Sequence, residues 1–221
     1  MCGRMANTLP TDSVARLFSA TPANDLPPVP DYNICPTQSV AVVTADAGRR
    51  LRPMRWGFLP HWYKSPTDGP LLINARSETV AEKPAFRSAV RERRCLVPVS
   101  GFYEWHRTKE ARLPWFAQRS DGEPLVLGGI WQDWGEERQP TLAILTTEAN
   151  AGMAPIHNRL PLVIEPADWG LWLGEQGHGA AVLMKPAGDD VLALHRVSTA
   201  VNSNRAEGPE LIEPYIEPSE A

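Results

Sequence analysis

The second residue of the chain, Cys2, carries two reactive groups once the initiator methionine is removed. Methionine aminopeptidases remove Met1 when the second side chain is small, and cysteine qualifies. An α-amine titrates near 7.7–8.0 and a thiol near 8.5, so both groups are partly reactive at neutral pH. Such a 1,2-aminothiol condenses with an aldehyde to an imine, and the thiol then closes a five-membered thiazolidine ring. Cys2 therefore predicts an aldehyde-capturing terminus; the alternative is an incidental cysteine at a frayed end.

Other residues with chemical potential lie in short segments spread over the chain. Gly3 and Arg4 follow Cys2 directly; glycine permits close backbone approach, and arginine offers a bidentate fork to phosphate. The chain has no GxGxxG, GxxxxGK[ST], HExxH or GxSxG motif, so nucleotide-cofactor, P-loop, zincin and hydrolase-elbow sites lose most of their support. The remaining segments are Asn74–Glu78 (NARSE), Cys95–Trp105 (CLVPVSGFYEW), His157–Pro161 (HNRLP) and Val201–Ser203 (VNS).

These segments, in this order, closely resemble the SRAP family, the SOS-response-associated peptidase proteins that crosslink to abasic sites in single-stranded DNA. The resemblance covers about residues 2–215, and four separate matches are more specific than any single motif. It implies a DNA-repair enzyme of the SOS response to DNA damage. In that family the residue after Met1 forms a thiazolidine with the ring-opened abasic sugar, which shields the strand and is expected to reverse slowly. The resemblance leaves room for a lyase activity.

The resemblance also implies the catalytic residues. Cys2 is the nucleophile, and Asn74, in the match to the family's NAR[SG]E motif, is expected to hold the amine or the ring by hydrogen bonds. Glu104, in the match to GFYEW, would shuttle protons during imine formation. His157, in the match to H-x-R-[ML]-P, would protonate the sugar oxygen as the ring opens. The bland alternatives are a solvated Glu104, a structural His157 and a turn-capping Asn74.

Arginine and aromatic side chains near these positions predict the DNA contacts. Arg4, Arg76 and Arg159 each lie within two residues of a proposed catalytic residue and are expected to reach flanking phosphates. The segment WGFLPHW resembles the family's WG-x-x-P-x-W element. Within it, Trp62 is the better candidate for stacking on bases, worth ~1–3 kcal/mol per stack, and Trp56 is expected to pack in the core.

A further segment, YNICPT, resembles the family's YN-[IV]-AP-T element, in which Asn33 and Thr37 would line the site. Cys35 departs from the commoner alanine there; a second reactive thiol is conceivable, but a small buried hydrophobic residue is the expectation. Cys95 lies in an apolar run and is expected to be inert. Three cysteines without a close pair do not support a disulfide framework or a four-cysteine zinc site, so we expect a reducing compartment, no metal and no cofactor.

Three classes of function follow. The preferred one is a crosslinking enzyme whose partner is single-stranded DNA containing abasic sites. The second is a peptidase or autoprocessing hydrolase, with Cys2 as N-terminal nucleophile and Asn74 as oxyanion donor. The third is a non-catalytic module for single strands or DNA ends, which predicts equal affinity for abasic and intact DNA.

Short elements must position these residues, because 22 of the 221 residues are proline, about twice the usual share. We expect a helix over Thr11–Phe18, with Thr11 as N-cap and Val14, Leu17 and Phe18 on its buried face. A second helix is expected from Pro84 to Arg94, with Phe86 and Val90 buried, and a third over 167–173 after Pro166. Residues 21–36 read as an extended loop. The β-rich runs are Val40–Thr44, Arg52–Phe58, Cys95–Val99, Leu125–Ile130 and Leu142–Thr147.

This pattern predicts an α+β fold: one domain with a mostly antiparallel, barrel-like β core and short flanking helices. We place the domain over residues 1–215 and an acidic tail over 216–221. Apolar residues make up 43% of the chain, enough for a core, yet no apolar run approaches the ~18 residues of a membrane span. With no signal peptide visible, we expect a cytoplasmic monomer, associated with the nucleoid in a bacterium.

The net charge of −4 speaks against a nucleic-acid binder only as an average. Residues 49–107 carry 12 Lys and Arg against 5 Asp and Glu, whereas residues 206–221 carry five Glu and no basic residue. The basic block contains the NARSE segment and the aromatic turn. The distribution therefore predicts a local basic groove for a short strand, with an acidic tail that stays clear of it or opposes nonspecific binding.

Overall fold

The computed structural model describes residues 2–45 and 47–216. Its strands are β1 (Met5–Asn7), β2 (Thr21–Pro22), β3 (Asp31–Ile34), β4 (Ser39–Ala45), β5 (Arg49–Trp56), β6 (Asn74–Arg76), β7 (Arg94–Val99), β8 (Gly101–Arg107), β9 (Arg112–Arg119), β10 (Leu125–Trp134), β11 (Gln139–Glu148), β12 (Arg159–Pro161) and β13 (Leu192–Arg196). Its helices are α1 (Thr11–Phe18), α2 (Arg87–Glu92) and α3 (Trp169–Leu173), with 3-10 turns η1 (Pro166–Asp168), η2 (Ala180–Leu183), η3 (Thr199–Asn202) and η4 (Pro209–Leu211).

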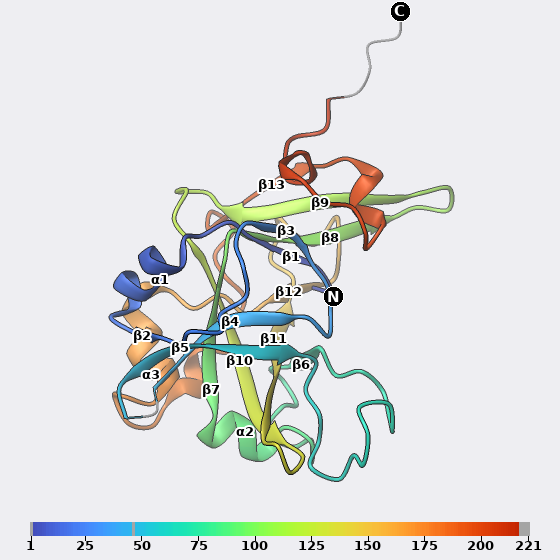
Figure 1. Cartoon of the computed structure of the whole chain (residues 1–221). Helices are drawn as coiled ribbons and strands as arrows, with labels where there is room; N and C mark the ends of the chain where they lie inside the picture. Colours follow the sequence, from blue (N-terminus) through green and yellow to red (C-terminus); the bar gives the residue numbers. More distant parts are fainter. Residues whose placement is uncertain (1, 46, 217–221) are drawn as a thin grey trace, which may run out of the picture.

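Five strands close into a barrel. In the order β11-β10-β7-β4-β5, each strand pairs antiparallel with the next. β5 then returns to β11 through two parallel pairs, Arg55 with Thr141 and Trp56 with Leu142. At the rim, β6 and β12 pair with β11, and β2 pairs with β5. The expected α+β fold with a mostly antiparallel, barrel-like core is therefore confirmed (Figure 1).

Alternation along the strands separates two cores. Val42 on β4 packs in one cluster with Trp56 and Cys95, whereas its neighbour Val43 packs in another cluster that contains residues of α1, α2 and α3. Successive side chains of a strand point to opposite faces, so the first cluster fills the barrel and the second joins its outer wall to the helices. The packing of the interior favours glycine at position 129, because a Cβ atom there would lie 2.9 Å from the Cys95 sulfur.

A second sheet, in the order β13-β9-β8-β1-β3, lies across one end of the barrel (Figure 1). Met5 of β1 and Phe102 of β8 belong to the same hydrophobic cluster as the barrel interior, so this sheet closes that end with apolar side chains. β1 runs between β8 and β3. The sheet therefore brings the N-terminal segment directly to the end of the barrel that it covers.

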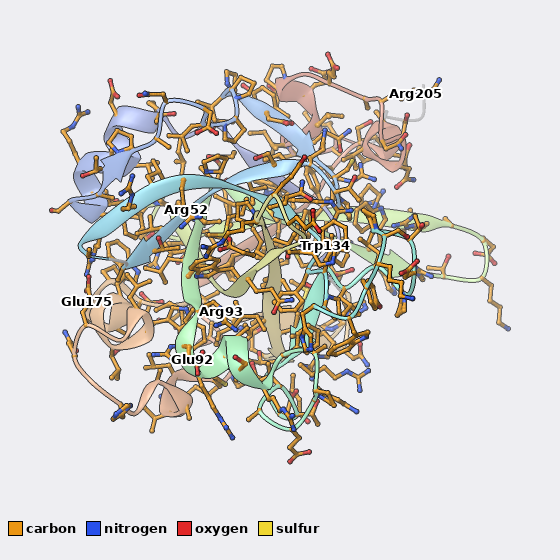
Figure 2. The ribbon with its side chains drawn as sticks, turned by 60° about the horizontal axis from the view of Figure 1, so that its bottom comes forward. Arg52, Glu92, Arg93, Trp134, Glu175 and Arg205 are labelled. Carbon is orange, nitrogen blue, oxygen red and sulfur yellow. The ribbon has the colours of Figure 1, made fainter. Side chains whose placement is uncertain are left out.

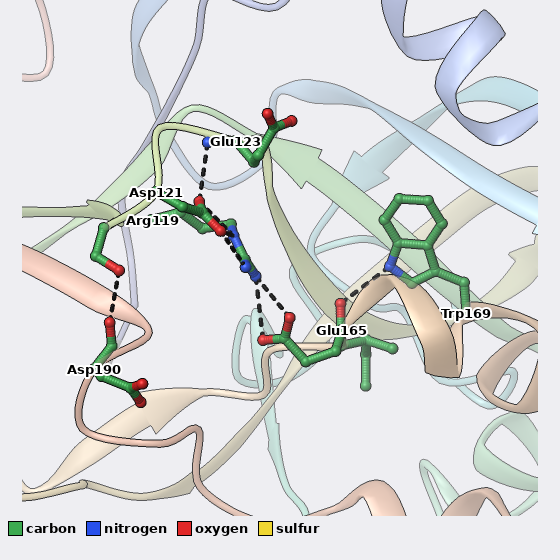
Figure 3. A network of polar contacts seen from close by, with 8 residues as sticks. Arg119, Asp121, Glu123, Glu165, Trp169 and Asp190 are labelled. Atoms are coloured by element: carbon green, nitrogen blue, oxygen red, sulfur yellow. Dashed lines mark hydrogen bonds and ion pairs between the residues drawn. The ribbon is translucent and has the colours of Figure 1, made fainter.

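An ion-pair cluster joins the second sheet to the segment before η1 (Figure 3). Arg119, at the end of β9, donates to Asp121 at 2.7 Å and to Glu165 at 2.9 Å. The indole of Trp169 donates to the carbonyl of Ile164 at 3.0 Å. One guanidinium shared by two carboxylates fixes the end of β9 against the helical side of the barrel.

The helix predictions are right in place and wrong in detail. α1 spans the expected residues, but Pro10 rather than Thr11 occupies its N-cap position, and Leu17 is 44% exposed while Val14, Ala15 and Phe18 are buried. The helix expected from Pro84 to Arg94 is limited to α2, because Arg94 already begins β7 and pairs with β10.

The strand predictions located the barrel and missed most of the second sheet. Each of the five predicted runs overlaps a barrel strand, and β5, β10 and β11 extend beyond the predicted ends. The predicted loop over residues 21–36 contains β2 and β3. The expected acidic tail, 216–221, lies outside the described residues except for the exposed Ile216.

Trp56 couples barrel closure to the position of β6, and its loss tests this role. Its ring is fully buried, and Nε1 donates to the carbonyl of Ile73 at 3.0 Å, beside Asn74. We expect Trp56→Ala to lower the free energy of unfolding by about 3–5 kcal/mol. Trp56→Phe should cost only about 1–2 kcal/mol, because Ile73 keeps a second donor, the amide of Ile144. Urea denaturation measures both; a Trp56→Phe variant as stable as wild type would contradict a role for the hydrogen bond.

The buried Cys95 thiol predicts a dependence of stability on pH. Burial raises the pKa of Cys95 above its ordinary value of 9.0, more than the nearby Arg52 lowers it. Between pH 8 and 10 only the unfolded chain releases this proton, so rising pH favours unfolding, by about 1 kcal/mol for one thiol. We expect the stability gap between wild type and Cys95→Ala to shrink by that amount between pH 8 and pH 10 in urea denaturation. A gap independent of pH would contradict the prediction.

Candidate active site

The Cys2 side chain lies inside the closed end of the barrel. It is 1% exposed and packs in the interior cluster with Met5 and Trp56. Its backbone carbonyl accepts a hydrogen bond from Asn74 Nδ2 at 2.8 Å. The structure therefore brings together two of the four predicted catalytic residues, which are 72 positions apart in the chain.

The rim strand β6 explains why Asn74 reaches Cys2. β6 pairs parallel with β11, with Asn74 opposite Ile144. The carbonyl of Ile73 accepts both the Ile144 amide, at 3.0 Å, and the Trp56 indole. Two donors from the barrel wall thus fix the residue before Asn74, and the Asn74 side-chain amide points to Cys2.

Glu104 lies on β8 in the same enclosed space. It is 3% exposed, which excludes the solvated alternative, and its Oε1 accepts the backbone N–H of Trp105 at 3.2 Å. Burial and, next, the negative charge of Glu104 raise the pKa of the Cys2 thiol to about 12. Cys2 is therefore a neutral thiol at physiological pH, with a carboxylate close enough to influence its ionisation.

His157 lies in the loop before β12 and lines an open pocket of about 510 Å³ together with Trp105 and Arg107. Its Nδ1 accepts the backbone N–H of Arg159 at 3.0 Å. In the neutral ring this bond assigns the proton to Nε2. His157 thus belongs to the pocket that adjoins Glu104 through Trp105.

Arg4 and Asn33 form a structural clamp next to Cys2. Arg4 donates to Asn33 Oδ1 and, at 3.0 Å, to the carbonyl of Val201. Asn33 Nδ2 donates in turn to the carbonyls of Ser203 and Ala206. Contacts of both side chains with DNA stay a prediction; in the structure their hydrogen bonds tie the N-terminal segment to the chain around η3.

The sequence reasoning assigned no role to the clamp around Trp105. The Trp105 indole donates to Asn202 Oδ1 at 2.7 Å, while the guanidinium of Arg112 lies 4.3 Å and that of Arg4 5.9 Å from the ring centroid. The ring is thereby held between cations at its faces and an amide at its edge. Asn202 falls in the VNS segment, so the signal was present, but its partner could not be read from the sequence.

The other two arginines differ in how they are used. Arg159 forms a bidentate pair with Glu78, at 2.8 and 2.9 Å, and also donates to the carbonyl of Thr146. Glu78 holds Arg159 as a phosphate would. Arg76 is exposed and shares an open pocket of about 420 Å³ with Asn158 and Arg159. Among the described residues no ion-pair partner of Arg76 is present, so this cation remains available to a ligand.

The remaining predicted residues are two exposed side chains, Trp62 and Thr37, and two cysteines, Cys35 and Cys95. Trp62 is 49% exposed, with the His61 ring 4.9 Å away, and Thr37 is exposed with a positive φ of 78°. Cys35 is half-buried and Cys95 is fully buried. The core position expected for Trp56 is confirmed, and Cys35 is less buried than expected; the inertness expected for Cys95 stays a prediction, with which its burial agrees.

Two further searches bear on the site. Within residues 2–45 and 47–216, no group of three or more His, Cys, Asp or Glu side chains is arranged to hold a metal ion. In the same part of the chain, no helix has both the length and the apolar character needed to cross a membrane.

Comparison with known proteins places this site in a family. The family model for SOS response associated peptidase (SRAP) matches residues 1–204. Abasic site processing protein YedK of Escherichia coli is 32% identical over 97% of this chain and 100% of its own length. Abasic site processing protein YoqW of Bacillus subtilis is 31% identical over the same shares. The corresponding protein HMCES of Rattus norvegicus is 30% identical over 97% of this chain and 76% of its own length.

A solved structure supports the same fold. A protein from Bacteroides thetaiotaomicron matches with a TM-score of 0.84 at 21% sequence identity, covering 97% of this chain and 100% of that one. The likeness extends over the barrel and the second sheet together. With a family match over most of its length and relatives at 30–32% identity, this chain belongs to the SOS response associated peptidase family.

Proposed function

We propose that this protein captures abasic sites in single-stranded DNA by forming a thiazolidine with Cys2. Abasic site processing is what its relatives are named for. The observation that carries the proposal is the hydrogen bond from Asn74 to the carbonyl of Cys2 beside the buried Glu104. It fixes the residue that would bear the free amine and the thiol next to a group able to move protons.

The proposed reaction has two steps after Met1 has been removed. The α-amine of Cys2 adds to the aldehyde carbon of the ring-opened sugar, and loss of one water gives an imine. The Cys2 S–H then adds across the C=N bond: sulfur bonds to carbon and the proton goes to nitrogen. The product has lost one water relative to the reactants. Running the same steps backward releases the DNA.

Each residue has a role that its surroundings support. Asn74 orients Cys2 through the backbone carbonyl, which leaves the amine free to react. Glu104 accepts and returns the protons of imine formation and ring closure, because it lies close enough to influence the thiol. His157 protonates the sugar oxygen as the ring opens, and the bond that its Nδ1 accepts from the Arg159 amide orients the ring.

The strand would run over the open pockets around this site. Arg76 supplies a cation for a phosphate, and Trp62 and Thr37 contact the flanking nucleotides from exposed loops. Arg159 contacts the DNA backbone only when its ion pair with Glu78 is replaced by an ion pair with a phosphate. Arg4 and Asn33 act by fixing the position of the N-terminal segment next to Cys2, and their own contacts with DNA are secondary in this proposal.

The crosslink is tested with an oligonucleotide that contains one abasic site. We expect wild type to give a band of reduced mobility on a denaturing gel, Cys2→Ala to give none, and Cys95→Ala, which removes another buried thiol, to keep the band. The adduct mass should equal the sum of protein without Met1 and DNA, less one water. A Cys2→Ala variant that still forms the band would contradict the proposal.

The peptidase alternative makes a different prediction for Met1. An oxyanion donor must face the carbonyl of the scissile bond, but Asn74 donates to the carbonyl of Cys2, beyond the Met1–Cys2 bond. We therefore expect Glu104→Ala expressed in bacteria to lack Met1 like wild type, by intact mass, because the host aminopeptidase removes it. Retention of Met1 in this variant alone would favour self-processing.

A further inference from the structure

A second pocket lies away from the Cys2 site, between α2 and η2. It has a volume of about 650 Å³, within the range of ligand pockets. Its apolar lining comes from Val80, Val90, Ala180, Ala181 and Met184. Figure 2 shows Glu92 and Arg93 on α2, with the helical turns of the C-terminal part of the chain next to it. None of the residues proposed to react or to contact DNA lines this pocket, although Glu78 in its lining pairs with Arg159.

The charges around this pocket do not cancel. Its two carboxylates are already paired: Glu78 with Arg159 at 2.8 Å and Glu92 with Arg93 at 3.0 Å. Arg91 is exposed, and in the described part of the chain no hydrogen bond or ion pair of its side chain is found. The lining therefore offers an apolar surface with an uncompensated cation at its edge.

Arg94 adds a second cation that is held in place. Its Nε donates to the carbonyl of Trp172, and its Nη1 donates to those of Val90 and Arg91, at 2.9 and 2.8 Å. All of these acceptors are neutral backbone carbonyls, so the half-buried charge keeps its attraction for an anion. The guanidinium is also rigid, which lowers the entropic cost of binding.

We propose that this pocket binds an acidic peptide segment of a partner protein, with an apolar side chain inserted among the aliphatic residues and carboxylates on Arg91 and Arg94. Charge complementarity carries the proposal, together with the character of the lining. None of the lining residues is Trp, Tyr or Phe, so a nucleobase finds no ring of that kind to stack on. Aliphatic side chains suit a leucine or phenylalanine of a peptide instead.

The site lies on one side of the Glu78–Arg159 pair, and the pocket of Arg76 lies on the other. A peptide and a DNA strand can therefore be bound at the same time while Arg159 stays paired with Glu78, because loss of that pair would leave a free carboxylate in the lining of the peptide pocket. The partner would bring this protein to DNA, or hold it there, without competing for the crosslinking site.

The experiment uses a fluorescein-labelled peptide, Asp-Glu-Asp-Leu-Glu-Phe, and fluorescence anisotropy. We expect saturable binding by the full chain. Peptides with the acids replaced by their amides, or with Leu and Phe replaced by Ser, should bind at least tenfold more weakly. Arg91→Glu and Ala181→Glu should weaken binding at least tenfold, and Arg91→Lys should restore most of it.

The matched control is Arg16→Glu on α1, an exposed arginine that does not line the pocket, which changes the net charge equally. Peptide binding by Arg16→Glu should equal that of wild type, and Arg91→Glu should crosslink abasic DNA like wild type, which separates this pocket from the proposed function. Absence of peptide binding, equal binding by Arg91→Glu, or loss of oligothymidine binding in Arg91→Glu would each overturn the proposal; the last would make the pocket a DNA surface.

Discussion

The hydrogen bond from Asn74 to the Cys2 carbonyl depends on the closure of the barrel. β6 lies at the rim only because β11 holds it in parallel register, and β11 is fixed there by its parallel pairing with β5. Trp56 belongs to this closure and also holds the residue before Asn74. One non-local pairing between strands thus sets both the fold and the placement of the reactive terminus.

Sequence reasoning recovered what depends on local pattern. The amphipathic residues of α1 and the apolar runs of the barrel strands are visible within about ten residues, and so they were predicted. β8 is buried from Gly101 to Trp105 and shows no polar alternation, and β9 contains a proline, so neither had the usual signature of a strand. The catalytic set came from family resemblance, because nothing in spacing alone brings Asn74 to Cys2.

Counting charges overstated the surface available to DNA. The basic block over residues 49–107 carries 12 Lys and Arg, yet several serve the fold. Arg49 pairs with Glu175, Arg55 donates to the carbonyl of Gly57, and Arg94 serves the backbone around α2. Which arginines remain free is a property of tertiary partners, because a sequence shows charges and not the acceptors that meet them. Arg76 and Arg91 are among the basic residues of the block for which the described part of the chain shows no ion-pair partner.

The contact between Arg4 and Val201 spans 197 positions of the chain. During synthesis the N-terminal segment leaves the ribosome first, whereas Val201, which completes its clamp, follows 197 residues after Arg4. At translation rates of about 5–20 residues per second, the interval is on the order of 10–40 s. The nascent terminus is open to methionine removal, and to stray cellular aldehydes, throughout this time. Until Val201 has been synthesised, Arg4 lacks this acceptor, so the N-terminal segment stays accessible to other molecules for that interval.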